Sequence, residues 1–150
     1  MKILDMQLSI AKTFKNHSVR YFPVEEVVIL RKIKAQLFVQ CDSIGILDHT
    51  HPDLNKIHEL WVKIRPQVLP GQEPDEVRFV QLDHDVSFFD QNNERMNDCT
   101  PFQSHGTYSL LLAIRGITKR VDADGKYKLI IRVKQAKIEE PVDDNKICHL

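Results

Sequence analysis

The chain has 150 residues, of which 42% are hydrophobic and 28% charged, the composition of one ordinary globular domain. Basic and acidic residues balance at 21 each, which excludes a bulk electrostatic attraction to nucleic acid or to a membrane surface. We find no signal peptide or bilayer-spanning run, and the three cysteines (Cys41, Cys99 and Cys148) have no metal-ligand spacing. We therefore expect an intracellular protein, nuclear or cytoplasmic, with reduced thiols, no cofactor and no membrane partner.

Apolar side chains near the N-terminus follow a loose helical spacing, which predicts an N-terminal helix within residues 1–17. The positions are Ile3, Leu4, Met6, Ile10 and Phe14. Residues 24–138 are rich in β-branched side chains and are predicted to form a β-rich core. The acidic tail, residues 139–150, is predicted to be mobile, so that residues 1–150 make a single domain.

An internal helix is predicted over residues 53–65. Pro52 suits the first helical turn, Asp53 suits the positive end of the helix dipole, and Pro66 ends the helix. The apolar positions share one face and are Leu54, Ile57, Leu60, Trp61 and Ile64. Because Trp61 belongs to this face, we expect it to be buried in the core.

Other segments read as strands, turns and loops. Strands are expected at 27–30, at 33–40 and at 77–89, the last with a bulge near Val80. The segment 33–40 is expected to be either a separate strand or a continuation of the first one past a bend. Ser43-Ile44-Gly45 is expected to form a bulge or a turn, and residues 90–102 are expected to form a long surface loop.

A hairpin near the C-terminus shows the clearest strand alternation. Its first strand is predicted to face inward with Tyr108, Leu110, Leu112 and Ile114. Asp124-Gly125 is a turn signal, since glycine accepts a positive φ without a Cβ clash. The return strand is predicted to face inward with Tyr127, Leu129, Ile131 and Val133.

Seven cations are predicted to gather on the outer face of this hairpin and at its tip. They are Arg115, Lys119, Arg120, Lys126, Lys128, Arg132 and Lys134. Such a face suits a phosphate backbone, because each neutralised phosphate releases counterions. Phe102, Tyr108 and Tyr127 are nearby in sequence as candidate base-stacking residues, although Tyr127 is predicted inward. The alternative is a solvated outer sheet face on which lysines prevent edge pairing.

The chain outline of small β units, an internal helix and a long closing hairpin resembles an OB-fold barrel. The segment 108–138 resembles the closing hairpin of small single-stranded-DNA-binding proteins, such as subunits of replication protein A and of telomere-capping complexes. Its pattern is Tyr-x-Leu-x-Leu-x-Ile, Gly116-Ile117, a Gly-Lys turn, and a Lys-rich strand ending at Lys137. The predicted helix comes earlier in the chain than the usual position between the third and fourth strands.

Histidine and carboxylate patterns raise an enzymatic alternative. His51, Asp53 and His105 resemble the facial iron ligands of 2-oxoglutarate-dependent oxygenases, which implies that Arg115 pairs with the co-substrate. Asp83-His84-Asp85 is interpreted as an exposed strand end with His84 on the opposite face from the two aspartates. Cys99 and His105 form a candidate nucleophile pair without any supporting motif.

The preferred hypothesis is a mainly β, OB-fold-like barrel or sandwich that is not an enzyme and holds no metal. We expect it to bind as one subunit of a hetero-oligomeric complex that handles single-stranded DNA in telomere capping, replication or repair. Two alternatives stay open: a protein–protein scaffold without nucleic-acid contact, and the iron-dependent oxygenase.

Overall fold

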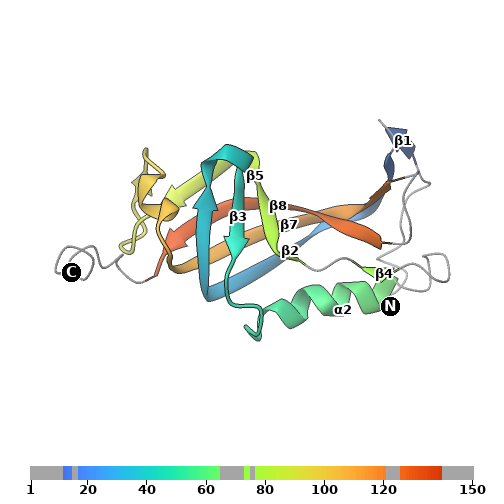
Figure 1. Cartoon of the computed structure of the whole chain (residues 1–150), viewed down its shortest axis with the longest axis horizontal. Coiled ribbons are helices and arrows are strands. Elements are labelled where there is room, and N and C mark those ends of the chain that lie inside the picture. Colours follow the sequence, from blue (N-terminus) through green and yellow to red (C-terminus); the bar gives the residue numbers. More distant parts are fainter. Residues whose placement is uncertain (1–11, 15–16, 65–72, 75–76, 121–125, 140–150) are drawn as a thin grey trace.

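The computed structural model describes residues 12–14, 17–64, 73–74, 77–120 and 126–139, and this part of the chain is mainly β (Figure 1). The strands are β1 (Lys12–Phe14), β2 (His17–Phe38), β3 (Ser43–Ile46), β4 (Glu73–Pro74), β5 (Phe79–Phe89), β6 (Arg95–Met96), β7 (Gly106–Arg120) and β8 (Lys126–Ile138). The helices are η1 (Val39–Cys41), α2 (Leu54–Ile64) and η3 (Thr100–Gln103). No helix among these residues is long and apolar enough to cross a membrane.

The sheet closes on itself through five strands. β2 pairs with β3, β3 with β5, β7 with β2 and β8 with β7, all antiparallel. A parallel contact between β5 and β8 completes the ring. Closure removes most free sheet edges, so the inward residues of all five strands share one apolar core.

The two strands of the C-terminal hairpin build much of this core. Every residue predicted inward on β7 and β8 is buried, as the alternation requires. The inward–outward alternation of β8 shifts by one residue at Lys134, which is an extra residue in the pairing with β7. After this bulge, Ala136 and Ile138 point inward. The hairpin prediction is therefore confirmed for the described strands; the turn at Asp124-Gly125 lies outside the described residues.

A bend allows the long strand β2 to follow the closed sheet. Lys32 has a φ of 52°, a left-handed conformation, at the register shift between Leu30 and Ile33. The two backbone N–H groups exposed at this bend find side-chain acceptors: Arg31 donates to Asp53 Oδ2 at 2.8 Å and Lys32 donates to Ser109 Oγ at 3.1 Å. Asp53 thereby fastens the start of α2 to the bend in β2.

Helix α2 runs beside the sheet and buries the face that the sequence predicted (Figure 1). Trp61 is 5% exposed, and its ring meets Tyr127 of β8 edge-on with centroids 4.7 Å apart. The prediction of one internal helix with Trp61 in the core is confirmed.

The segment predicted as a surface loop instead carries β6, η3 and a buried aromatic group. Phe102 of η3 is buried against Phe88 and Tyr108, with ring centroids 4.9 and 4.8 Å away. The Tyr108 hydroxyl donates to the Ser104 carbonyl at 2.7 Å, and burial raises the pKa of Tyr108 to about 12. The loop prediction missed Phe102 because one aromatic residue within a polar stretch has no periodicity.

Three further expectations are corrected. Lys12–Phe14 forms β1 rather than part of an N-terminal helix; residues 1–11 of that prediction lie outside the described residues. Ser43–Ile46 forms strand β3 rather than a bulge or a turn, because the reversal of the chain after β2 takes place earlier, at η1. Glu139 is held by a backbone hydrogen bond to Thr107 and by Ser109, whereas residues 140–150 of the predicted tail lie outside the described part.

Truncation of Trp61 tests the helix packing. Trp61→Ala should lower the free energy of unfolding by about 3–5 kcal/mol, because it removes a large buried ring from contact with Tyr127. Urea unfolding measures this change. Val62→Ala, one position along the same helix and exposed, is the matched control and should change the free energy by less than about 0.5 kcal/mol. Equal small losses in both variants would contradict the packing.

Candidate nucleic-acid interface

The outer face of β7 and β8 does not present the predicted cations as one set. Arg115, Lys128, Arg132 and Lys134 have described side chains. The side chains of Lys119, Arg120 and Lys126 lie outside the described part of the chain, although their backbone belongs to β7 and β8. Among the four, two cations are neutralised by carboxylates and two line a groove.

Arg115 and Lys134 belong to a charged network that crosses the outer face. The Asp83 carboxylate accepts hydrogen bonds from Lys134 Nζ at 2.7 Å and from Arg115 Nη2 at 3.3 Å. Lys134 Nζ also donates to Asp85 at 2.9 Å, and Arg115 Nε donates to Glu25 at 3.2 Å. Three carboxylates therefore face two cations, so these two cations have no excess charge to offer a phosphate.

Irregularities in the strand pairing bring these side chains together. Asp83 and Asp85 lie in the stretch of β5 that leaves register with β8, between Leu82 and Ser87. Lys134 and Arg115 lie at register shifts of the β7–β8 pairing, and Glu25 lies in the shift between β2 and β7. Alternation correctly places Arg115 and Lys134 on the outer face, but the carboxylates reach them from β2 and β5, which are far away in sequence. The sequence pattern therefore did not predict the network.

Asp83 is the buried member of this network, 5% exposed beneath the cations that bind it. The hydrogen bond from Lys134 and the neighbouring charge of Arg115 hold the pKa of Asp83 well below its ordinary value. The same hydrogen bond raises the pKa of Lys134. Both groups therefore stay charged across the neutral range.

A groove of about 540 Å³ lies beside the network, where β5 and β8 separate. Their parallel pairing begins at Gln81 and Arg132, and the earlier residues of the two strands diverge. The groove is lined by Val77, Arg78, Phe79, Gln81, Thr118, Lys128, Leu129, Ile130, Ile131 and Arg132. The lining combines a large exposed aromatic ring, apolar surface and three cationic side chains.

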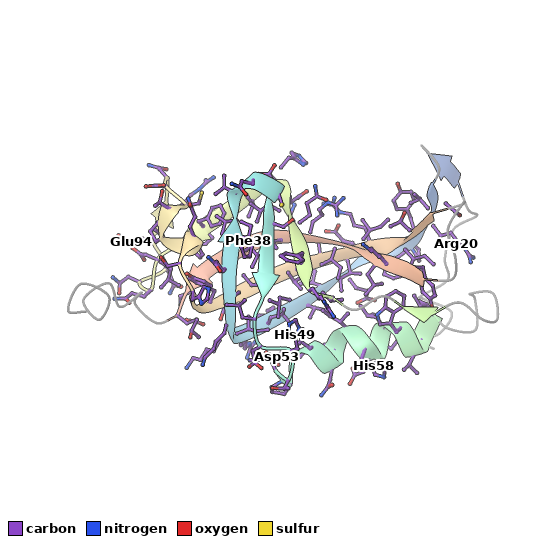
Figure 2. The ribbon with its side chains drawn as sticks, viewed as in Figure 1. Arg20, Phe38, His49, Asp53, His58 and Glu94 are labelled. Carbon is purple, nitrogen blue, oxygen red and sulfur yellow. The ribbon has the colours of Figure 1, made fainter. Side chains whose placement is uncertain are left out.

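Phe79 forms the aromatic side of this groove and is 62% exposed. Its ring meets Phe38 edge-on with centroids 5.8 Å apart, and Phe38 lies at the end of β2 beside β3 (Figure 2). Both rings lie over Gly45 of β3, where a Cβ would stand 2.7 Å from Phe38 and 3.2 Å from Phe79. Glycine at this position therefore lets the two rings rest on the sheet.

Arg132 lies in the groove, and no described carboxylate forms an ion pair with it. Its guanidinium donates to the Ile131 carbonyl at 3.0 Å, and among the described residues no carboxylate lies within ion-pair distance of it. Burial and the nearby charge of Arg115 lower its pKa. A half-buried arginine that no described carboxylate pairs, at the wall of a groove, favours an anionic ligand.

The aromatic candidates chosen from sequence do not serve this interface. Phe102, Tyr108 and Tyr127 are all buried in the core, so none is available to stack on a base. The exposed ring is Phe79, which sequence reasoning missed. It has no local signal, because its exposure depends on the separation of β5 from β8.

The Asp83-His84-Asp85 segment was predicted to place His84 away from both aspartates, and this is wrong. Within the described residues it is the one group of three metal-type side chains whose ligand atoms approach one another, all within 4.8 Å. His84 Nδ1 lies 3.4 Å from Asp83 Oδ1. The Lys134 ammonium, however, already bridges the two carboxylates and supplies the cation that they need.

The iron-ligand set proposed from sequence is not assembled. His51 Nδ1 accepts the Asp53 N–H at 3.1 Å, and Asp53 binds β2, whereas His105 directly precedes β7 and joins no group with them. Figure 2 shows Asp53 in the connection before α2. Arg115, the implied co-substrate ligand, is bound by Glu25 and Asp83. No geometry supports a Cys99–His105 pair.

Comparison with protein-family models, with curated protein sequences and with solved structures gives no match. The groove and the charged network are therefore the features from which a function of this chain can be inferred.

Replacement of Asp83 tests the network. Asp83→Asn should lower the free energy of unfolding at pH 6 by about 2 kcal/mol, because two charged donors lose the negative charge of the oxygen that they share. The folded-state pKa of Asp83 lies below its unfolded value, so its contribution is complete above about pH 4 and is lost on further acidification. The difference between wild type and Asp83→Asn should shrink below about pH 4, as measured by urea unfolding across pH.

The matched control is Asp85→Asn, which removes an exposed negative charge beside the same Lys134 ammonium. It should change the stability much less than Asp83→Asn does. A stability difference between wild type and Asp83→Asn that stays constant down to pH 2 would contradict the assignment.

Proposed function

We propose that this protein binds single-stranded nucleic acid along the groove between β5 and β8, as one subunit of a larger complex. The observation that carries the proposal is the exposed Phe79 ring at the side of a groove that Arg132 and Lys128 also line. Aromatic stacking on bases combined with cationic contact to the backbone is the general chemistry of single-strand binding.

We further propose that the closed sheet is an OB-fold barrel. Its five strands in chain order are β2, β3, β5, β7 and β8, and η1 connects the first two. In such barrels the face of the second and third strands binds oligonucleotides, together with the loops after the first and fourth strands. Gly45 and Phe79 belong to the second and third strands here, which supports a ligand path over this face.

The position of the long helix departs from the usual outline. Helix α2 lies between the second and third strands of the ring, whereas the usual position between the third and fourth strands holds the short helix η3. Phe102 of η3 nevertheless fills the core at that connection. The departure concerns the connections and leaves the groove-bearing face of β5 and β8 open.

The balanced net charge predicts modest affinity for the isolated chain. Only part of the predicted cationic face has charge to offer, since Arg115 and Lys134 are paired. A subunit of this kind gains affinity when a partner extends the binding surface. We propose that such a complex handles single-stranded DNA in telomere capping, replication or repair.

A protein–protein scaffold remains the second candidate, and a specific surface favours it. Val24 and Val27 on β2 are 74% and 58% exposed. Nearby Ile29 and Leu111 line a hollow of about 260 Å³. Exposed apolar surface of this kind is typical of protein interfaces, and such contact is compatible with nucleic-acid binding elsewhere on the sheet.

Removal of the exposed ring tests the proposal. Phe79→Ala should weaken binding of a labelled single-stranded oligonucleotide about 5- to 150-fold. This range corresponds to the loss of one stacked base, which is worth about 1–3 kcal/mol. Fluorescence anisotropy with DNA and RNA of the same sequence measures the affinities and the preference between them. A duplex should bind more weakly, because its bases are not free to stack.

The control is Val62→Ala, which removes an exposed apolar side chain from α2, outside the groove. It should bind as wild type does. Absence of oligonucleotide binding by wild type, alone and with co-purified partners, would exclude the nucleic-acid function and leave the scaffold.

A further inference from the structure

The charged network next to the groove has a consequence for Arg132. Asp83 is the carboxylate with electrostatic influence on Arg132, but its oxygens already accept hydrogen bonds from Lys134 and Arg115. Asp85 and Glu25 are likewise engaged, by Lys134 and Arg115 respectively. These three carboxylates are therefore paired with Lys134 and Arg115 and do not compete for Arg132.

Position in the sheet separates Arg132 from these two cations. Arg132 pairs in register with Gln81 of β5 and Ala113 of β7, at the end of the groove. Lys134 and Arg115 lie at bulges on either side of it along the sheet, and both direct their charged ends to Asp83. Neighbouring basic residues on the same face thus have different electrostatic roles.

We propose that Arg132 is the phosphate-binding residue of the groove, and that the Asp83 network keeps it available by holding Arg115, Lys134 and the surrounding acids in closed ion pairs. This inference rests on the proposed function and names Arg132 as the residue that contacts the phosphate backbone of the nucleic acid. The ligand chemistry is a phosphodiester anion, for which the planar fork of arginine has a matching geometry.

The network also limits where the phosphate binds. Three carboxylates against two cations leave no positive charge at the Asp83 end of the face. A phosphate is therefore favoured on the groove side of Arg132, near Lys128 and within the groove that Phe79 borders. Lys134, although part of the predicted cationic face, acts as a positioning residue.

The salt dependence of oligonucleotide binding separates these roles. One lost phosphate contact lowers the slope of log affinity against log salt by about 0.7 for a single strand. Arg132→Gln should show this loss. Asp83→Asn/Lys134→Gln, which removes one charge of each sign, leaves no carboxylate at position 83 to compete for Arg132 and retains the Arg115–Glu25 pair, should keep the wild-type slope. Lys137→Gln, on the same strand but outside the groove lining, is the control for loss of a single cation.

A second measurement follows Arg132 directly with inorganic phosphate. The Nε–Hε resonance of Arg132, assigned by its absence in Arg132→Gln, should shift saturably with added phosphate and stay in place with sodium chloride at equal ionic strength. Thermal unfolding establishes that each variant is folded before binding is compared.

The outcomes distinguish this inference from the proposed function. Oligonucleotide binding with an unchanged slope in Arg132→Gln would overturn the phosphate assignment and leave single-strand binding intact. A slope lost equally in Asp83→Asn/Lys134→Gln would transfer the contact to Lys134 and overturn it as well. A phosphate-dependent Arg132 shift in a protein that binds no oligonucleotide would support the anion site and reject the nucleic-acid function.

Discussion

The ion pair between Asp83 and Lys134 spans the line along which the sheet closes. β5 and β8 pair in parallel on both sides of Asp83–Val86 but lose register between Leu82 and Ser87, so backbone hydrogen bonds do not hold this stretch. The Lys134 ammonium, itself at a bulge of β8, reaches Asp83 and Asp85 and joins the strands through side chains. A short charge-assisted hydrogen bond to a buried carboxylate is among the stronger polar contacts available for this purpose.

The groove and its charge depend on the same closure. Because β5 meets β8 only from Gln81 onward, the strands diverge before that point and leave Phe79 exposed above the lining of β8. Arg132 stands where the separation begins, and Asp83 follows two residues after Gln81. One irregular contact between parallel strands therefore creates the hollow, exposes the ring and separates Arg132, which no described carboxylate pairs, from the paired cations.

Much of the architecture could be predicted from local pattern. Alternation placed Tyr108, Leu112 and Val133 in the core, and helical spacing placed Trp61 there, because burial of one face is repeated along a regular element. Less could be predicted of the candidate site. Lys134 and Arg132 appear equivalent by alternation, yet one is paired with Asp83 and the other lines the groove, and Phe79 has no pattern that marks its exposure.

The sequence by itself determined a mainly β chain with one amphipathic helix and an apolar hairpin, since these follow from the period of the hydrophobic residues. Only the tertiary structure decided which charges are free. The pairing of β5 with β8 and of β2 with β7 brought Asp83 and Glu25 to Arg115 and Lys134, which alternation already placed on the outer face. The physical reason is that an ion pair depends on distances of a few ångströms between strands far apart in sequence, which no local periodicity encodes.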